Sequence, residues 1–147
     1  EAEIQRMYFW AKQMGVYLFG FSEDPNPNHY NPYKPIMTKG MGGGGAYGVL
    51  KGGNLKFNEN TTACDSHYIN LLNALLNRKT LIDTRFCFRP IDTFRGDGGQ
   101  SLKRTMETEK IDTMYLRRQF GEVVKLRANK KNAKANHKYQ RTIVYEW

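Results

Sequence analysis

Residues 22–48 place the strongest limit on what this chain can fold into. Four prolines lie within residues 22–35, with asparagines between them, and six of the nine residues from 40 to 48 are glycine. Proline fixes one backbone dihedral angle and has no N–H to donate, so neither a helix nor a central strand can persist here. We therefore predict a long irregular loop over residues 22–46. A stretch this long is unusual inside a compact domain and indicates a functional loop or a segment that a partner orders.

Three segments have the pattern of helices. Residues 3–14 carry apolar side chains at spacings of three and four, which is typical of an amphipathic helix. Residues 65–77 are apolar around most of a helix, and Asp65 or a preceding threonine can cap its start. A charged segment from about residue 108 to residue 128 is the third predicted helix, which Gly121 weakens.

Three other segments have the pattern of strands. Residues 15–21 are apolar on both faces and rich in aromatic side chains, so we expect a buried strand. Residues 81–88 alternate between apolar and polar side chains, as a half-buried strand does. The end of the chain, residues 141–146, is expected to form a closing strand.

Two adjacent glycines, at positions 52 and 53, separate short segments that could pair as a hairpin. Glycine adopts the positive φ angles that a two-residue hairpin turn needs, so we predict strands at 47–51 and 54–57. The hydrophobic content of 39% and the charged content of 25% indicate a folded chain, and 147 residues suit a single domain covering 1–147. We predict an α+β fold with a small mixed or antiparallel sheet, which includes the Gly-Gly hairpin, packed against two or three helices and bearing long Pro/Asn- and Gly-rich loops.

No arrangement of residues typical of a catalytic or metal site occurs in the sequence. The nuclease patterns considered need clustered carboxylates around a divalent ion, or a histidine on a hairpin strand, and neither is present. Three histidines and two cysteines are scattered singly, so we expect no metal and no cofactor. Cys64, Asp65 and His67 are neighbours in sequence, whereas catalytic triads are usually assembled from separate segments. The sequence therefore favours a role other than catalysis.

Two short motifs have simpler interpretations. The glycine run at residues 40–45 contains a GxGxxG match, but it does not follow a clear strand, so we interpret it as a flexible loop or as backbone that closely approaches a ligand or neighbour. The Arg-Gly-Asp sequence at residues 95–97 is interpreted as an ordinary turn. No motif resembles a known family closely enough to name one.

The positive charge of the chain is unevenly distributed. The net charge is +9; residues 1–100 contribute +2, from 11 lysines and arginines against 9 acids, and residues 101–147 contribute +7, from 12 against 5. No acidic residue occurs between Val123 and Tyr145. Clustered cations without acids are typical of a segment that neutralises phosphates, so we predict a basic segment at residues 125–141 that binds RNA or DNA without sequence specificity. Its seven cations are Lys125, Arg127, Lys130, Lys131, Lys134, Lys138 and Arg141.

An alternative is that the protein is a structural subunit of a large assembly, such as a virus or phage particle or a ribosome-like complex. The long irregular loops and the basic segment suit a chain that its protein neighbours order. No apolar run approaches the length of a membrane span, and the first residues lack the pattern of a signal peptide. We therefore expect no membrane partner and a location inside the cell, in cytoplasm or nucleus, or within a virion.

Overall fold

The computed structural model describes residues 1–22, 26–27, 30–42, 45–88, 105–126 and 141–143. The chain divides into two compact units, which are described separately: residues 1–57 with 69–91, and residues 58–68 with 92–147. The expected single domain over residues 1–147 stays a prediction.

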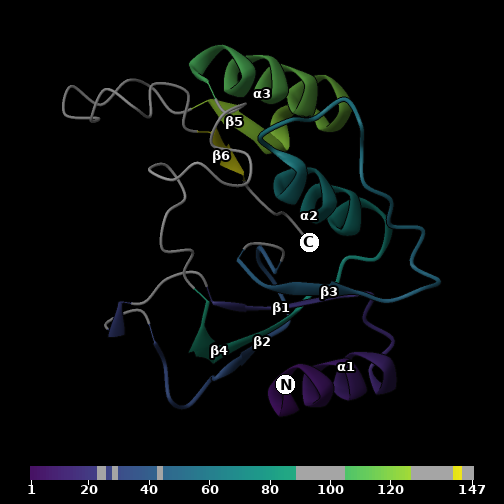
Figure 1. Cartoon of the computed structure of the whole chain (residues 1–147), viewed down its shortest axis with the longest axis vertical. Coiled ribbons are helices and arrows are strands. Elements are labelled where there is room, and N and C mark those ends of the chain that lie inside the picture. Colours follow the sequence, from purple (N-terminus) through teal and green to yellow (C-terminus); the bar gives the residue numbers. More distant parts are fainter. Residues whose placement is uncertain (23–25, 28–29, 43–44, 89–104, 127–140, 144–147) are drawn as a thin grey trace. The chain divides into compact units, whose positions relative to one another are not determined.

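The first unit contains a four-stranded mixed sheet in the order β2-β4-β1-β3 (Figure 1). The central strand β1, Leu18–Ser22, pairs parallel with β4, Leu81–Cys87, and antiparallel with β3, Tyr47–Val49. The edge strand β2, Ile36–Met37, pairs antiparallel with β4. The predicted α+β class with a small mixed sheet is therefore confirmed. The predicted strands at 15–21 and 81–88 are also present, with shifted bounds.

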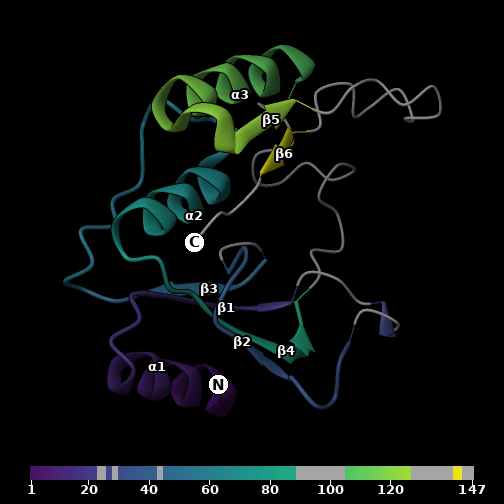
Figure 2. The same cartoon turned by 180° about the vertical axis from the view of Figure 1, so that it is seen from behind.

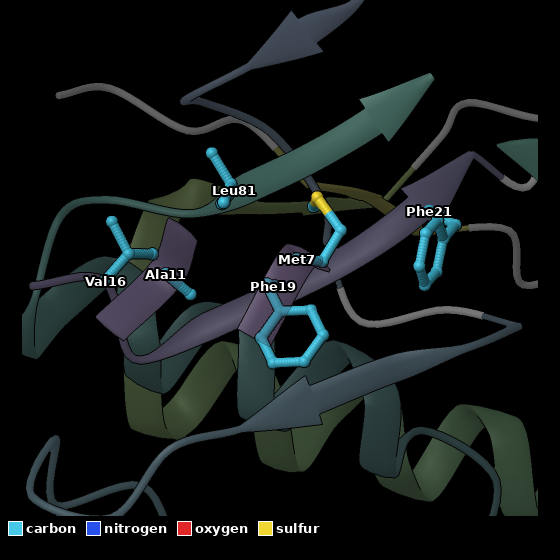
Figure 3. Close-up of a cluster of buried hydrophobic side chains, with 6 residues drawn as sticks. All are labelled: Met7, Ala11, Val16, Phe19, Phe21 and Leu81. Atoms are coloured by element: carbon cyan, nitrogen blue, oxygen red, sulfur yellow. The ribbon is translucent and has the colours of Figure 1, made fainter. Parts of the chain in front are cut away.

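Helix α1, Ala2–Gln13, packs on the sheet through a small apolar cluster (Figure 3). Met7 and Ala11 are one turn apart and fully buried, because they contact the face of the sheet that carries Phe19. The helix was predicted, but its buried face is narrower than expected, since Ile4 and Tyr8 are about half exposed. The complete cluster consists of Met7, Ala11, Val16, Phe19, Phe21 and Leu81.

Helix α2, Asp65–Leu76, confirms the second predicted helix but not its uniformly apolar burial. Leu75 is 65% exposed, whereas Asn70 and Asn73 are buried. Asn73 Nδ2 donates hydrogen bonds to the carbonyl oxygen of Lys79 at 2.9 Å and to Thr80 Oγ1 at 3.1 Å. Asn73 is buried because its amide group holds the backbone that follows the helix, a role that a hydrophobicity pattern does not reveal.

The predicted irregular loop at 22–46 contains the edge strand β2 and glycines that pack closely on the sheet. A two-residue edge strand tolerates the neighbouring Pro35, because only one side of it pairs. A Cβ atom on Gly20 would lie 1.7 Å from the carbonyl oxygen of Gly42, and the Gly42 N–H donates to Asn70 Oδ1 at 2.9 Å. Within the described part of the glycine run, close approach to the sheet therefore explains the absence of side chains.

The predicted Gly-Gly hairpin is wrong in its pairing. Strand β3 pairs with β1, and residues 54–57 form no strand. Gly52 does adopt a positive φ of 108°, but the turn packs against Tyr17, whose Cβ would lie 2.4 Å from a Cβ on Gly53. Asn77 Nδ2 also donates to the carbonyl oxygen of Gly53 at 3.0 Å. These tertiary contacts, rather than a neighbouring strand, hold the turn.

The second unit contains α3, Met106–Phe120, and the strands β5, Val124–Leu126, and β6, Arg141–Ile143. Thr105 and Thr108 form a reciprocal capping box at the start of α3. The helix predicted to reach residue 128 ends at Phe120, because Gly121 has φ 71° and ψ −146°, a conformation almost restricted to glycine. A single 3-10 turn, η2 at Gly121–Val123, leads into β5.

Candidate nucleic-acid interface

The basic segment belongs to a β-hairpin formed by β5 and β6. These strands pair antiparallel, with Lys125 opposite Thr142 and Leu126 opposite Arg141, and Figure 2 shows them side by side. The segment was expected to connect a helix to a closing strand. It instead begins inside one strand and ends inside the strand paired with it.

The structure describes two of the seven predicted cations. Lys125 lies on β5 and its side chain is exposed, next to Val124, which is fully buried. Arg141 begins β6, and its backbone pairs next to that of Lys125. The ladder thus places the backbone of the first and last cations of the segment at diagonal positions, not directly opposite each other. The other five, Arg127, Lys130, Lys131, Lys134 and Lys138, lie outside the described residues.

A buried carboxylate on α3 organises part of the second unit. Asp112, on α3, is 2% exposed, and its Oδ2 accepts hydrogen bonds from the backbone N–H groups of Thr62, Ala63 and Cys64 at 2.9, 2.6 and 3.0 Å. Three successive N–H groups form a strong anion site, which here receives a carboxylate of the same chain. Sequence reasoning considered Asp65 or a threonine for the start of α2 and missed Asp112, because nothing in the sequence relates two segments about fifty residues apart.

Several acids of α3 and its end are engaged in contacts within the chain or are buried. Asp112 is bound as described, and Glu109 is only 8% exposed. Glu122, just after the helix, accepts from Arg117 at 2.8 Å. Among the described residues of α3 and its end, Glu107 is the acid that is exposed and has no ion pair.

Two arginines of the first unit form ion pairs with a buried aspartate. Asp83 is fully buried, and both Arg6 and Arg85 contact its Oδ2, at 2.7 and 2.8 Å. Burial alone would raise the pKa of Asp83, but the hydrogen bonds from Arg85 and the charges of Arg85 and Arg6 outweigh it and hold that pKa below its ordinary value. Arg85 is therefore engaged in an ion pair within the first unit.

Two aromatic side chains of β1 and β4 belong to the core of the first unit or pack against it. Phe19 is 4% exposed, and Phe86 packs edge-on against Phe21 with ring centroids 6.4 Å apart. Among the described residues, no three histidine, cysteine or acidic side chains gather in a way that could hold a metal ion. None of the helices in the described ranges has both the length and the apolar character needed to cross a bilayer.

Comparison with known proteins adds no constraint on this interface. No protein-family model, no curated protein and no solved structure matches the chain.

Proposed function

We propose that this protein is a non-catalytic nucleic-acid-binding protein that contacts the phosphate backbone of RNA or DNA through residues 125–141. The observation that carries the proposal is that an acid-free run with seven cations begins and ends on paired strands of one hairpin. The ladder fixes the two ends of the segment next to each other, so ordering the segment on binding is expected to cost less chain entropy than ordering a tail with one free end. Phosphate contacts carry no sequence information, so binding is expected to be sequence-nonspecific.

The proposal predicts steep salt dependence. If all seven cations contact phosphates of duplex DNA, the logarithm of the binding constant falls with the logarithm of salt concentration with a slope of about −6. Fluorescence anisotropy with a labelled duplex and a labelled single strand measures this slope. Absence of binding at low salt would reject the proposal.

Substitutions test whether the basic segment is the site. Replacing Lys130, Lys131, Lys134 and Lys138 with alanine removes four cations and should lower the slope on duplex DNA by about 4. Two single variants that each remove one positive charge control for the change in net charge. Lys131→Ala should lower the slope by about 1. Lys34→Ala, which replaces an exposed lysine before β2, should leave the slope unchanged. Equal effects of the two single variants would contradict the assignment.

A second candidate function, a structural subunit of a large assembly, is favoured by exposed apolar side chains on α1. Ile4, Tyr8 and Phe9 are 47%, 50% and 57% exposed on one short helix. Apolar groups that gather on a surface are typical of contacts with other proteins. Light scattering tests this function, because an assembly subunit should associate as concentration rises and Phe9→Ser should weaken that association. A monomer at all concentrations would contradict it.

A further inference from the structure

One end of the four-stranded sheet gathers loops from three distant parts of the chain. Strands β1 and β4 run in the same direction and β2 and β3 run against them, so the residues after β2, after β3 and before β4 reach the same end. The Thr80 N–H donates to the carbonyl oxygen of Thr38 at 3.2 Å, and Asn77 Nδ2 donates to the carbonyl oxygen of Gly53 at 3.0 Å. These two hydrogen bonds tie the loop before β4 to both of the others.

Each of these three loops carries exposed cations. Lys39 follows β2, Lys51 follows β3, and Arg78 and Lys79 precede β4; we call these four side chains the basic sheet end. None of them forms an ion pair with a carboxylate among the described residues, in contrast to Arg6 and Arg85.

The acids of the chain are absent from the segments that build the basic sheet end. Residues 36–58 contain no aspartate or glutamate, and neither do residues 66–82. Four cations that share one sheet end without a neutralising acid repel one another, and an anionic ligand relieves that repulsion. The arrangement therefore suits a partner with several phosphates.

The backbone of Arg78 is a second, independent indication of function. Arg78 has a φ of 60°, in the left-handed region that favours glycine. The equivalent place just beyond α1 is occupied by glycine, since Gly15 has a φ of 63°. An arginine in this conformation carries an energetic cost that glycine avoids, and such costs are concentrated at functional sites.

An exposed aromatic side chain lies on the segment that leaves this sheet end. Phe57 is 60% exposed, and its ring centroid is 6.4 Å from that of Tyr47 on β3. The neighbouring Lys56 is also exposed. An exposed ring on a segment that also carries cations is typical of proteins that stack on the unpaired bases of a single strand.

We propose that the basic sheet end is a second nucleic-acid contact, which binds the phosphates of a single strand while Phe57 stacks on its bases. The site goes beyond the function proposed for residues 125–141, because it uses none of those residues. It is formed entirely within the first unit.

The experiment uses the full chain with Lys130, Lys131, Lys134 and Lys138 replaced by alanine, so that the first site loses four of its seven cations. Anisotropy with a labelled oligothymidylate should show residual binding in this background. Lys79→Ala should then lower the salt slope by about 0.7, the value for one contact with a single strand, whereas Lys34→Ala should leave it unchanged. Absence of residual binding, or equal effects of Lys79→Ala and Lys34→Ala, would overturn the second site. Failure of the first site is a different result, in which the fourfold replacement itself leaves wild-type affinity intact.

Two further variants separate recognition from folding. Arg78→Gly removes a cation and relieves the left-handed backbone, so it should weaken oligothymidylate binding severalfold while the melting temperature stays equal or rises. Phe57→Ala should weaken binding of oligothymidylate about tenfold and leave binding of inorganic polyphosphate unchanged, because only the oligonucleotide has bases to stack. The proposal is overturned if Arg78→Gly binds as tightly as the background, or if Phe57→Ala does not discriminate between the two ligands.

Discussion

At the scale of single residues, Asp83 determines which side of α1 faces the sheet. Its buried carboxylate binds Arg6 from the helix and Arg85 from its own strand. The guanidinium of Arg6 also lies 4.9 Å from the ring centroid of Trp10, at a cation–π distance. The helix therefore turns Met7 and Ala11 toward the sheet and leaves Ile4 and Tyr8 at the surface.

Asp83→Asn should destabilise the first unit by about 2 kcal/mol, because the buried side chain loses the charge that accepts hydrogen bonds from Arg6 and Arg85. Chemical denaturation monitored by tryptophan fluorescence measures the loss, since Trp10 packs beside this ion pair. Lys34→Ala, which touches no ion pair among the described residues, is the control and should change stability by less than about 0.5 kcal/mol. A loss as small as that of the control would show that the ion pair contributes little.

The same residue makes stability depend on pH in a defined range. Because the pKa of Asp83 is lower in the folded protein than its unfolded value of about 3.9, its contribution is complete above that value. The contribution is lost as pH falls below about 4 toward the folded pKa. Wild-type stability should therefore fall more steeply than that of Asp83→Asn between about pH 4 and pH 2. Parallel curves would contradict the lowered pKa.

Sequence reasoning could place Asp83 on a strand but not in the core. Alternation assigned Asp83, Arg85 and Cys87 to one polar face, and Arg85 and Cys87 are indeed exposed. Asp83 is buried because α1 covers its end of the strand and brings Arg6. A pattern of period two describes one strand and contains no information about the helix packed on it.

At the scale of elements, α3 and the chain segment before α2 are joined by Asp112. Its three backbone hydrogen bonds link residues that are 48 to 50 positions apart. Asp112, one of the acids of the third predicted helix, is therefore a structural anchor of the second unit.

Asp112→Ala should reduce the stability of the second unit by about 3 kcal/mol, because three N–H groups lose a charged acceptor. Asp112→Asn keeps one oxygen acceptor and should lose less. Hydrogen exchange at Thr62, Ala63 and Cys64 reports the effect locally, with protection falling in the order wild type, Asn, Ala. Unchanged protection in Asp112→Ala would contradict the anchoring role.

The ends of elements were predictable only where a residue has one backbone preference. Gly15 was expected to end the first helix, and α1 does stop just before it. Gly121 was expected only to weaken the third helix, yet it ends it and redirects the chain into β5. Tertiary structure explains why Gly121 ends the helix. If the helix stops there, β5 can pair with β6, and this pairing joins segments that a local sequence pattern does not relate.

At the scale of the whole molecule, charge is the property that most directly suggests function. The net charge of +9 is distributed between the basic segment and the rest of the chain, and the basic sheet end accounts for part of the latter. A ligand that binds only the folded state stabilises it by mass action.

Saturating oligonucleotide should therefore raise the melting temperature. At a free concentration one hundred times the dissociation constant, the stabilisation is about 2.7 kcal/mol. Differential scanning calorimetry at low and at high salt measures the shift, which should shrink as salt competes for the cations. A shift that does not change with salt would contradict binding through phosphates.

The sequence by itself determined the α+β class, the three helices, the strands that flank the irregular segment, and the basic segment, because each depends on local propensity, periodicity or counted charge. Only the tertiary structure decided the sheet order, the partner of β3, the hairpin that holds the basic segment, and the positions of Asp83 and Asp112. Strand pairing and buried polar contacts depend on which distant segments meet. The basic sheet end belongs to this second group, since Lys39, Lys51 and Lys79 become neighbours only when the strands pair.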